Sequence, residues 1–244
     1  MTRRIIRHGE VDSTNERALV AIAEGEAEHG DVHLATAQTA GRGSRGRAWD
    51  SPAGEGLYMS VVLLPQSPPC SPAVLTMGAA LGVHAFLTDL GVPALSLKWP
   101  NDILVDGAKI CGILVESRGL DPRRPAFACG IGLNVRQRSF PAEFAERRVT
   151  SLALLDKDHG PDDLVAALAD HLDPSWDQAF SAPRALAERF GAVARLTGAT
   201  VRVQTNDGER RGRVASIGLE GVCLKTDGEV VVLPLEHVVS VERT

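Results

Sequence analysis

The chain has 244 residues, of which 44% are hydrophobic and 23% charged, a balance that is ordinary for a globular protein. Its net charge of −5 argues against a general nucleic-acid binder, because non-specific affinity for nucleic acid comes from neutralising phosphates. The sequence contains no run of about 18 apolar residues and no signal-peptide pattern, so we expect a soluble, cytoplasmic protein without a membrane anchor. The cysteines form neither a metal-binding pair nor a disulfide framework, and we expect Cys111 and Cys129 to be reduced core residues.

The first quarter of the chain predicts one helix and two strands. Residues 15–24 follow the helix-start signal Asp12-Ser13-Thr14 and place their apolar side chains on one stripe, which predicts a helix. Residues 32–37 and 57–64 are apolar runs that predict strands. Between them, residues 41–56 are too rich in glycine and arginine to be regular throughout.

The middle of the chain is dense in strands and is flanked by helices. A helix that is apolar almost all round is expected over residues 72–90, and it should therefore be buried. Strands are expected at 95–98, 103–105, 109–116 and 126–135, with a hairpin turn at Asp106-Gly107, and helices at 161–180 and 182–190. This order predicts an α+β fold with a mixed sheet rather than a strict alternation of strand and helix.

From residue 199 the pattern changes to short strands separated by turns, which is typical of a small antiparallel β-barrel. The expected strands are 201–203, 213–217, 222–224, 230–233 and 238–241. We therefore expect two domains, a larger one of residues 1–194 and a small β-barrel domain of residues 195–244.

The loop from Gly41 to Arg47 matches the pattern G-x-G-x-x-G, which occurs in dinucleotide-binding folds. That fingerprint needs a helix directly after the glycines, whereas here a strand is expected, so the dinucleotide interpretation fails. The loop instead carries three arginines within six residues, whose planar guanidinium groups suit carboxylates and phosphates. A solvated basic loop is the alternative, but the flanking strands and Trp49 favour a ligand site.

The segment Lys98-Trp99-Pro100-Asn101-Asp102 joins two strands at a corner that Pro100 makes rigid. A structural turn is one interpretation, with the asparagine and the aspartate as turn formers. A lysine at a rigid corner together with an arginine-rich glycine loop is also what phosphoryl chemistry on ATP requires, because that chemistry needs charge and positioning. The carboxylate and amide oxygens of Asp102 and Asn101 are suited to Mg²⁺.

Taken as an ordered set, these segments resemble the biotin–protein ligase family. The resemblance extends over about 140 residues and includes an expected small C-terminal barrel. It is carried by Ser13-Thr14-Asn15, Gln38-Thr39-Ala40-Gly41-Arg42-Gly43 with Gly46-Arg47-Ala48-Trp49, Lys98-Trp99-Pro100-Asn101-Asp102, Lys109-Ile110-Cys111-Gly112-Ile113-Leu114-Val115-Glu116, Gly130-Ile131-Gly132-Leu133-Asn134-Val135 and Thr150-Ser151-Leu152.

The resemblance implies a catalytic domain like that of class II aminoacyl-tRNA synthetases, followed by a small β-barrel. It also implies an activity in two steps. Biotin and Mg-ATP form biotinyl-adenylate and pyrophosphate, and a lysine of a biotin carboxyl carrier protein or carboxylase subunit then attacks the adenylate to give an amide and AMP. No nucleic-acid or membrane partner is expected, and the oligomeric state, including a homodimer, stays open.

The resemblance also implies roles for individual residues by their position. Biotin would be bound by Ser13, Thr14, Asn15, Gln38, Gly41, Arg42, Gly43, Ser44, Lys98, Gly112, Gly130 and Gly132. ATP would be bound by Arg45, Arg47, Trp49, Asn101 and Asn134, and Mg²⁺ by Asn101 and Asp102. The catalytic residues would be Lys98, which would bridge the biotin carboxylate and the α-phosphate, and Arg42, Arg45 and Arg47.

Two departures from the family pattern carry their own expectations. Ser44 stands where members usually carry arginine, so we expect weaker retention of the adenylate unless Arg45 compensates. The chain begins almost at Ser13, which leaves no room for the N-terminal helix-turn-helix of repressor members, so we expect a ligase without repressor function.

Three rival interpretations remain. A lipoate–protein ligase shares the fold and the two-step chemistry, although the Lys98–Asp102 segment and the Gln38–Gly43 loop favour biotin. A non-enzymatic module that binds biotin or a nucleotide is opposed by the intact Arg42, Arg47 and Lys98. A nucleic-acid-binding barrel is disfavoured by the negative net charge.

Overall fold

The computed structural model describes residues 3–65, 71–118, 124–141, 148–226 and 228–244. The larger part of the molecule contains β1 (Ile5–Val11), α1 (Thr14–Glu24), β2 (Val32–Gln38), the 3₁₀ turn η1 (Ser44–Gly46), β3 (Gly56–Leu63), α2 (Pro72–Asp89), β4 (Leu95–Lys98), β5 (Asp102–Val105), β6 (Ala108–Glu116), β7 (Phe127–Asn134), η3 (Ala153–Leu155), η4 (Asp162–Leu164), α3 (Val165–Ser181) and α4 (Pro183–Val193). The C-terminal part contains β8 (Thr200–Thr205), β9 (Gly208–Ile217), β10 (Val222–Thr226), β11 (Glu229–Leu233), η5 (Leu235–His237) and β12 (Val238–Arg243).

The larger sheet has seven strands in the order β1-β2-β3-β7-β6-β5-β4. Strands β1 and β2 are parallel, and the other neighbours are antiparallel, which confirms the predicted mixed sheet. The expected hairpin between β5 and β6 is present, and its turn residues Asp106 and Gly107 both have positive φ. Strand β1 was not predicted, because its sequence IIRHGEV alternates weakly and most of its side chains stay partly exposed at the edge of the sheet.

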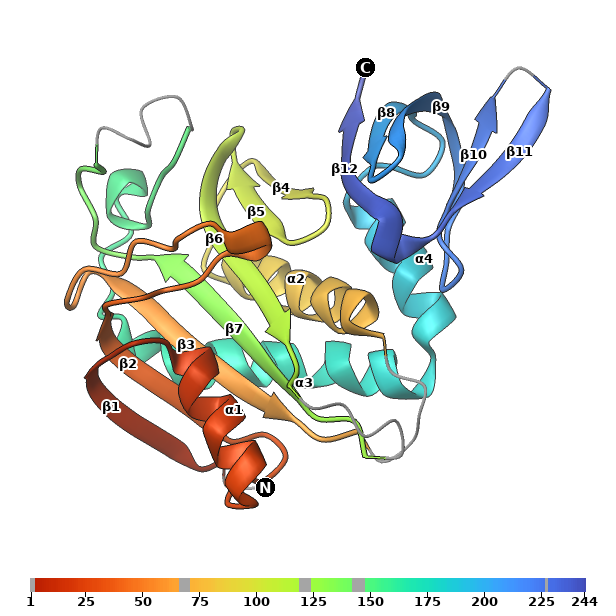
Figure 1. The fold of residues 1–244 in the computed structure, drawn as a ribbon. Helices are drawn as coiled ribbons and strands as arrows, with labels where there is room; N and C mark the ends of the chain where they lie inside the picture. Colours follow the sequence, from red (N-terminus) through yellow and green to blue (C-terminus); the bar gives the residue numbers. More distant parts are fainter. Residues whose placement is uncertain (1–2, 66–70, 119–123, 142–147, 227) are drawn as a thin grey trace.

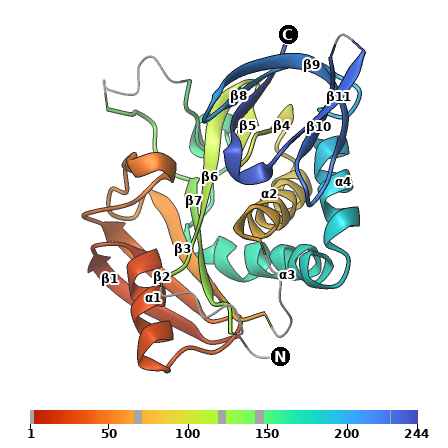
Figure 2. The same cartoon turned by 45° about the vertical axis from the view of Figure 1, so that its right-hand side comes forward.

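Helices cover both faces of this sheet (Figures 1 and 2). On one face, α1 packs through Ala18 and Leu19 against Val62 of β3 and Ala128 of β7. On the other face, α2 contacts β4, β5, β6 and β7 and is itself covered by α3 and α4. The sequence of α2 is apolar almost all round because the helix is enclosed by the sheet on one side and by helices on the other, as predicted.

The helix ends follow ordinary capping chemistry. At the start of α2, the Ser71 side chain accepts a hydrogen bond from the backbone N–H of Ala73, and Pro72 occupies the first turn. At the end of α1, Gly25 adopts the left-handed conformation that terminates helices. Among the described residues, no helix has the length and apolar character needed to cross a membrane.

The C-terminal part forms an antiparallel five-stranded sheet in the order β11-β10-β9-β8-β12, as predicted, and the closure of this sheet into a barrel stays a prediction. Helix α4 packs against both α2 and β9 and so links this sheet to the rest of the molecule. Helices give way to short strands between the end of α4 at Val193 and the start of β8 at Thr200, where the domain boundary is expected. The division of the chain into two domains at this point stays a prediction. Cys111 and Cys129 are buried, as predicted, whereas Cys70 lies outside the described residues.

Candidate active site

The glycine- and arginine-rich loop between β2 and β3 folds back on itself as a compact strap. Arg42 and Ala48 form an isolated antiparallel bridge, the N–H of Gly43 donates to the Arg47 carbonyl at 2.7 Å, and the N–H of Trp49 donates to the Gly41 carbonyl at 2.9 Å. Because its two legs are bonded to each other, the loop has a defined shape over the sheet (Figure 1).

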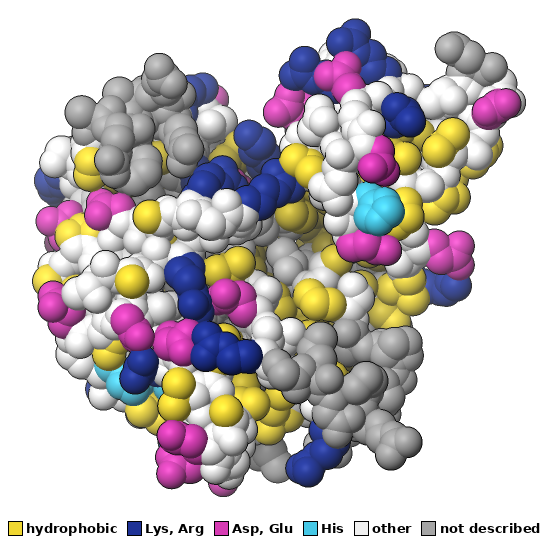
Figure 3. Space-filling view, viewed as in Figure 1, with side chains coloured by type: hydrophobic (Ala, Val, Ile, Leu, Met, Phe, Trp, Pro, Cys, Tyr) yellow, Lys and Arg dark blue, Asp and Glu magenta, His cyan; other side chains and the backbone are white. Residues whose placement is uncertain are grey.

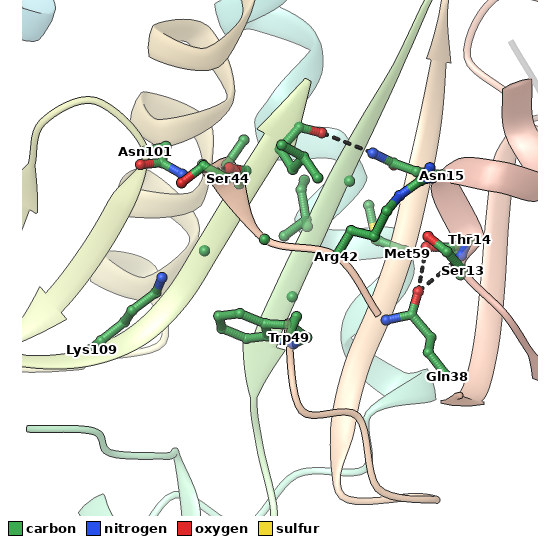
Figure 4. Close-up of a pocket in the computed structure, with 17 residues that line it drawn as sticks. Ser13, Thr14, Asn15, Gln38, Arg42, Ser44, Trp49, Met59, Asn101 and Lys109 are labelled. Carbon is green, nitrogen blue, oxygen red and sulfur yellow. Dashed lines mark hydrogen bonds between the residues drawn. The ribbon is translucent and has the colours of Figure 1, made fainter. Parts of the chain in front are cut away.

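Two adjoining cavities lie on either side of this loop. The first, of about 40 Å³, is lined by α1, by β6 and β7 and by the loop, and it is drawn in Figure 4. The second, of about 380 Å³, lies toward the β4–β5 corner and the segment around Asn134. Gly43, Ser44, Trp49 and Lys109 line both cavities, so these residues mark the junction between them.

One end of the first cavity is polar but uncharged. The Gln38 carboxamide oxygen accepts from the backbone N–H of Thr14 at 2.9 Å and from its hydroxyl at 3.3 Å, and its N–H group donates to the Ser51 hydroxyl at 2.8 Å. Ser13 is the N-cap of α1 and lines the same cavity. Neutral donors and acceptors at a helix N-terminus suit a ligand group that forms hydrogen bonds without carrying a positive charge.

Glycines on neighbouring strands make room for Trp49. Gly112 of β6 pairs with Gly132 of β7, and the indole of Trp49 lies against both. A Cβ atom at Gly132 would come within 2.4 Å of the Trp49 ring, and one at Gly112 within 2.8 Å. Any side chain at either position would therefore displace the indole, which explains why both glycines belong to the site.

Lys109 supplies the positive charge at the junction. Its ammonium group forms an ion pair with Asp102 at 2.6 Å and lies 5.0 Å from the centre of the Trp49 ring (Figure 4). Lys98, the lysine that was expected to bridge the two ligands, is exposed and lines the second cavity. The sequence interpretation had named Lys109 as part of a motif without giving it a role.

Most other predicted site residues are gathered at the two cavities. Asn15, Arg42, Gly130 and Asn101 line the first cavity, and Arg47, Asp102 and Asn134 line the second. The amide groups of Asn101 and Asn134 are largely committed to the protein, since they donate to the carbonyls of Ile113 at 2.8 Å and Thr150 at 2.9 Å. Asn101, for which contacts with ATP and Mg²⁺ are predicted, lines the first cavity, and its role stays a prediction.

The three loop arginines have three different surroundings. Arg47 donates to the Ser44 carbonyl at 3.1 Å and to the Ser44 hydroxyl at 2.8 Å. Arg45, which has a left-handed backbone with φ of 61°, donates to the Val239 carbonyl of β12 in the C-terminal sheet. Arg42 forms ion pairs with Glu16 and Glu116.

Side chains that the sequence interpretation did not predict complete the second cavity. Gln137, Phe140 and Arg148 line it, and all three come after β7 in the chain. Basic side chains are gathered along the rim of the hollow between the main body and the C-terminal part (Figure 3). Cys111, next to Gly112, is not an available nucleophile, because burial raises the pKa of its thiol far above its usual range.

The fold thus places two cavities next to each other, an arrangement that suits a protein that binds two small ligands side by side. The profile of the Biotin/lipoate A/B protein ligase family matches residues 9–135. The chain belongs to this family.

Relatives with known names match over most of the chain. The biotin–[acetyl-CoA-carboxylase] ligase of Mycobacterium tuberculosis is 32% identical over 93% of this chain and 85% of its own length. The bifunctional ligase/repressor BirA of Bacillus subtilis is 30% identical over 94% of this chain and 71% of its own length. BirA of Escherichia coli is 37% identical over 52% of this chain, which corresponds to 39% of that protein.

Solved structures agree with the fold over nearly the whole chain. The biotin protein ligase of Aquifex aeolicus in complex with biotin and ATP has a TM-score of 0.81 and 26% identity, and the match covers 99% of both chains. The biotin protein ligase of Leishmania major in complex with biotinyl-5-AMP has a TM-score of 0.60 and 26% identity, over 94% of this chain and 98% of that one.

Proposed function

We propose that this protein is an ATP-dependent biotin–protein ligase that forms biotinyl-5′-AMP and transfers biotin to a lysine of a biotin carboxyl carrier protein. The observation that carries the proposal is the pair of cavities that meet at Lys109, in a chain whose relatives include structures with biotin, ATP and biotinyl-5-AMP. The protein acts in the cytoplasm, where its carboxylase partner is made.

The first cavity receives biotin. The uncharged end formed by Ser13, Thr14 and Gln38 bonds the ureido ring, and the Gly112–Gly132 floor and Trp49 enclose the apolar part of the ligand. This orientation directs the biotin carboxylate toward Lys109 at the junction. The cavity is narrow, so the loop that carries Trp49 opens to admit the ring system and closes over it.

The second cavity receives ATP, with its α-phosphate next to the same lysine. A carboxylate oxygen of biotin attacks the α-phosphorus, the bond to the β-phosphate breaks, and pyrophosphate leaves. The two anions repel each other, so a cation between them is needed to hold them in line. Lys109 occupies that place and also stabilises the negative charge that builds on the α-phosphoryl oxygens.

Lys98, Arg47 and Asp102 serve the nucleotide end of the second cavity. Lys98 and Arg47 neutralise the β- and γ-phosphates, and Asp102, which pairs with Lys109 through one carboxylate oxygen, would offer its other oxygen to Mg²⁺. Mg²⁺ is commonly held by one or two carboxylates together with phosphates and waters, so Asp102 with the phosphates of ATP would be the donor set expected here. When bound, the metal neutralises the charge of the leaving pyrophosphate.

The second step transfers biotin to the carrier. The neutral amine of the acceptor lysine attacks the carbonyl carbon of the mixed anhydride, an amide bond forms, and AMP leaves with the bonding electrons. Trp49 and the glycine loop protect the anhydride from water until the acceptor arrives. The partner that fits this chemistry is a carboxylase subunit that presents an accessible lysine.

Pyrophosphate exchange tests both the substrate and the lysine. The protein is incubated with MgATP, radiolabelled pyrophosphate and either biotin or lipoate, and label in ATP is measured. We expect exchange with biotin that falls at least about 100-fold in Lys109→Ala, a loss typical of a group that stabilises transition-state charge. Lys98→Ala should mainly raise the KM for ATP, and Lys225→Ala, on the exposed surface of β10, should match the natural protein.

Each other result has a defined meaning. Exchange with lipoate in place of biotin would keep the fold and chemistry but change the substrate. Collapse in Lys98→Ala with near-normal exchange in Lys109→Ala would return the bridging role to Lys98. Exchange with neither acid would contradict the proposed enzyme.

A further inference from the structure

The side chain of Arg42 lies at the wall of the first cavity, but its positive charge is already paired with carboxylates of the protein. Its two terminal nitrogens are used by two carboxylates, with Nη1 3.2 Å from Glu16 and Nη2 3.1 Å from Glu116. Figure 4 shows Arg42 beside Asn15, at the side of the cavity. Because both ends of the guanidinium fork are occupied, a substrate carboxylate would have to displace a glutamate to bind there.

The two glutamates come from rigid elements on which the cavity is built. Glu16 is in the first turn of α1, and Glu116 is the last residue of β6. Glu116 also accepts from the Asn15 side chain at 2.7 Å, and the oxygen of Asn15 accepts from the buried Ser60 hydroxyl at 2.6 Å. Glu116 is thus fixed by a bonded chain that reaches the central strand β3.

Arg42 is also the point at which the loop can be held. The base of the loop is fixed by backbone bonds from Thr39 to Val11 and from Ala40 to Asp12. Between Gly41 and Trp49, the described side-chain hydrogen bonds from the loop to other elements are those of Arg42 to α1 and β6 and that of Arg45 to β12, whereas Ser51, further along, is bonded to Gln38 of β2. The backbone of Arg42 is paired with that of Ala48, so contacts that fix the Arg42 side chain restrain both the outgoing and the returning strand of the loop.

We propose that Glu16 and Glu116 are positioning residues for the biotin cavity. Through their ion pairs with Arg42 they hold the glycine-rich loop in place and so set the affinity for biotin. This proposal rests on the proposed function. Neither glutamate lines either cavity, so they act on the closure of the loop and not on the chemistry at Lys109.

A third contact provides a matched control. Arg118 also binds Glu16, through two hydrogen bonds of 2.7 Å, but it is more exposed than Arg42, and its described hydrogen bonds are to Glu16 and not to the loop. Its guanidinium is the main reason why the pKa of Glu16 is lowered. Removing Arg118 breaks an ion pair of the same glutamate while leaving Arg42 with both partners.

The experiment measures the Kd for biotin by calorimetry without ATP, and kcat and KM in pyrophosphate exchange. Partly exposed ion pairs are individually weak, so we expect Glu16→Ala and Glu116→Ala each to raise the Kd about threefold and the double variant about tenfold. The kcat at saturating biotin should stay within about twofold, since neither ion pair changes during the reaction. Arg118→Ala should keep the Kd of the natural protein.

The Arg42→Ala variant separates positioning from general stability. If both glutamates act through Arg42, adding Glu16→Ala and Glu116→Ala to Arg42→Ala should not raise the Kd further. Glu16→Gln and Glu116→Gln remove the charge but keep the side-chain shape, and they replace an alanine variant that fails to fold. An unchanged Kd in the double variant, or a Kd that rises equally in Arg118→Ala, overturns the proposal. A natural protein that binds no biotin overturns the proposed function itself.

Discussion

Ser44 is the residue whose chemistry is least expected at the junction of the two cavities. It lines both of them, and its hydroxyl accepts a hydrogen bond of 2.8 Å from Arg47. A neutral side chain there gives the carbonyl and phosphate of an adenylate one cation fewer to bind. The nearby Arg45 is bonded to β12, so in this structure it does not compensate for the missing charge.

We therefore expect Ser44→Arg to release less free biotinyl-adenylate than the natural protein when no acceptor is present. The adenylate that leaves the protein is separated by filtration and quantified over time. Ser216→Arg, which adds the same charge at an exposed position on β9, should release as much as the natural protein. Equal release from Ser44→Arg and the natural protein would contradict the expectation.

Much of the site could be predicted at the residue scale, because glycines and polar residues in ordered motifs mark it. The role of Lys109 could not, because it depends on the register of β5 with β6, which brings Asp102 and Lys109 to the same junction. The same holds for Glu16, whose partner Arg42 is remote in sequence. A sequence pattern names residues but does not say which charges are already paired in the fold.

Among the secondary-structure elements, the pair β1 and β2 contains a buried titratable contact. His33 of β2 is buried, and its Nδ1 lies 3.2 Å from the Nε2 of His8 on β1. Burial first, and the neighbouring His8 second, lower the pKa of His33 to about 4. Asp31 acts in the opposite direction, whereas Arg4 and Arg17 lower the pKa further.

This contact predicts a loss of stability in mild acid. Below pH 6.5 the unfolded chain protonates His33 while the folded protein resists protonation, so the stabilisation is complete above about pH 6.5 and is lost as the pH falls toward 4. The lowered pKa of His33 corresponds to about 3 kcal/mol of stability when fully developed. The free energy of unfolding is measured with urea at pH 7.5 and at pH 5. Between these two pH values it should fall less in His33→Gln than in the natural protein. A parallel loss in both proteins would contradict the assignment.

Strands and helices differ in how far the sequence predicts them. The helices and the inner strands were predicted because their apolar residues recur with a clear period or in continuous runs. Strand β1 was missed because an edge strand buries few side chains and its parallel partner β2 lies beyond a whole helix. Strand β9 begins earlier than expected, because its first five residues, GERRG, are polar and pair with β8 through backbone bonds.

For the whole molecule, the two sheets share one apolar core. Phe190 of α4 is fully buried, and its ring lies 5.8 Å from that of Trp99 in an edge-to-face arrangement. The same cluster continues through Val214 and Ile217 of the C-terminal sheet. A continuous core favours a single cooperative transition over separate unfolding of two domains.

Calorimetry should therefore show one transition for the natural protein. Phe190→Ala should lower the stability by about 3–5 kcal/mol and still give one transition, because the lost ring supports both sheets. Leu154→Ala, at a side chain that is 45% exposed, should change little. Two resolved transitions would contradict the shared core and would support the predicted division at residue 195.

The pairing of β3 with β7 has a consequence for synthesis of the chain. Gly56 pairs with Asn134, so the floor beneath Trp49 is supplied by a segment that leaves the ribosome long after the loop itself. Contacts between distant segments slow folding and leave early segments uncovered. A nascent chain that ends before β7 thus has the glycine loop, the start of α1 and Gly112 of β6, but it lacks Gly132, the other half of the floor. The capacity to bind a ligand should appear abruptly, once β7 has emerged and joined the sheet.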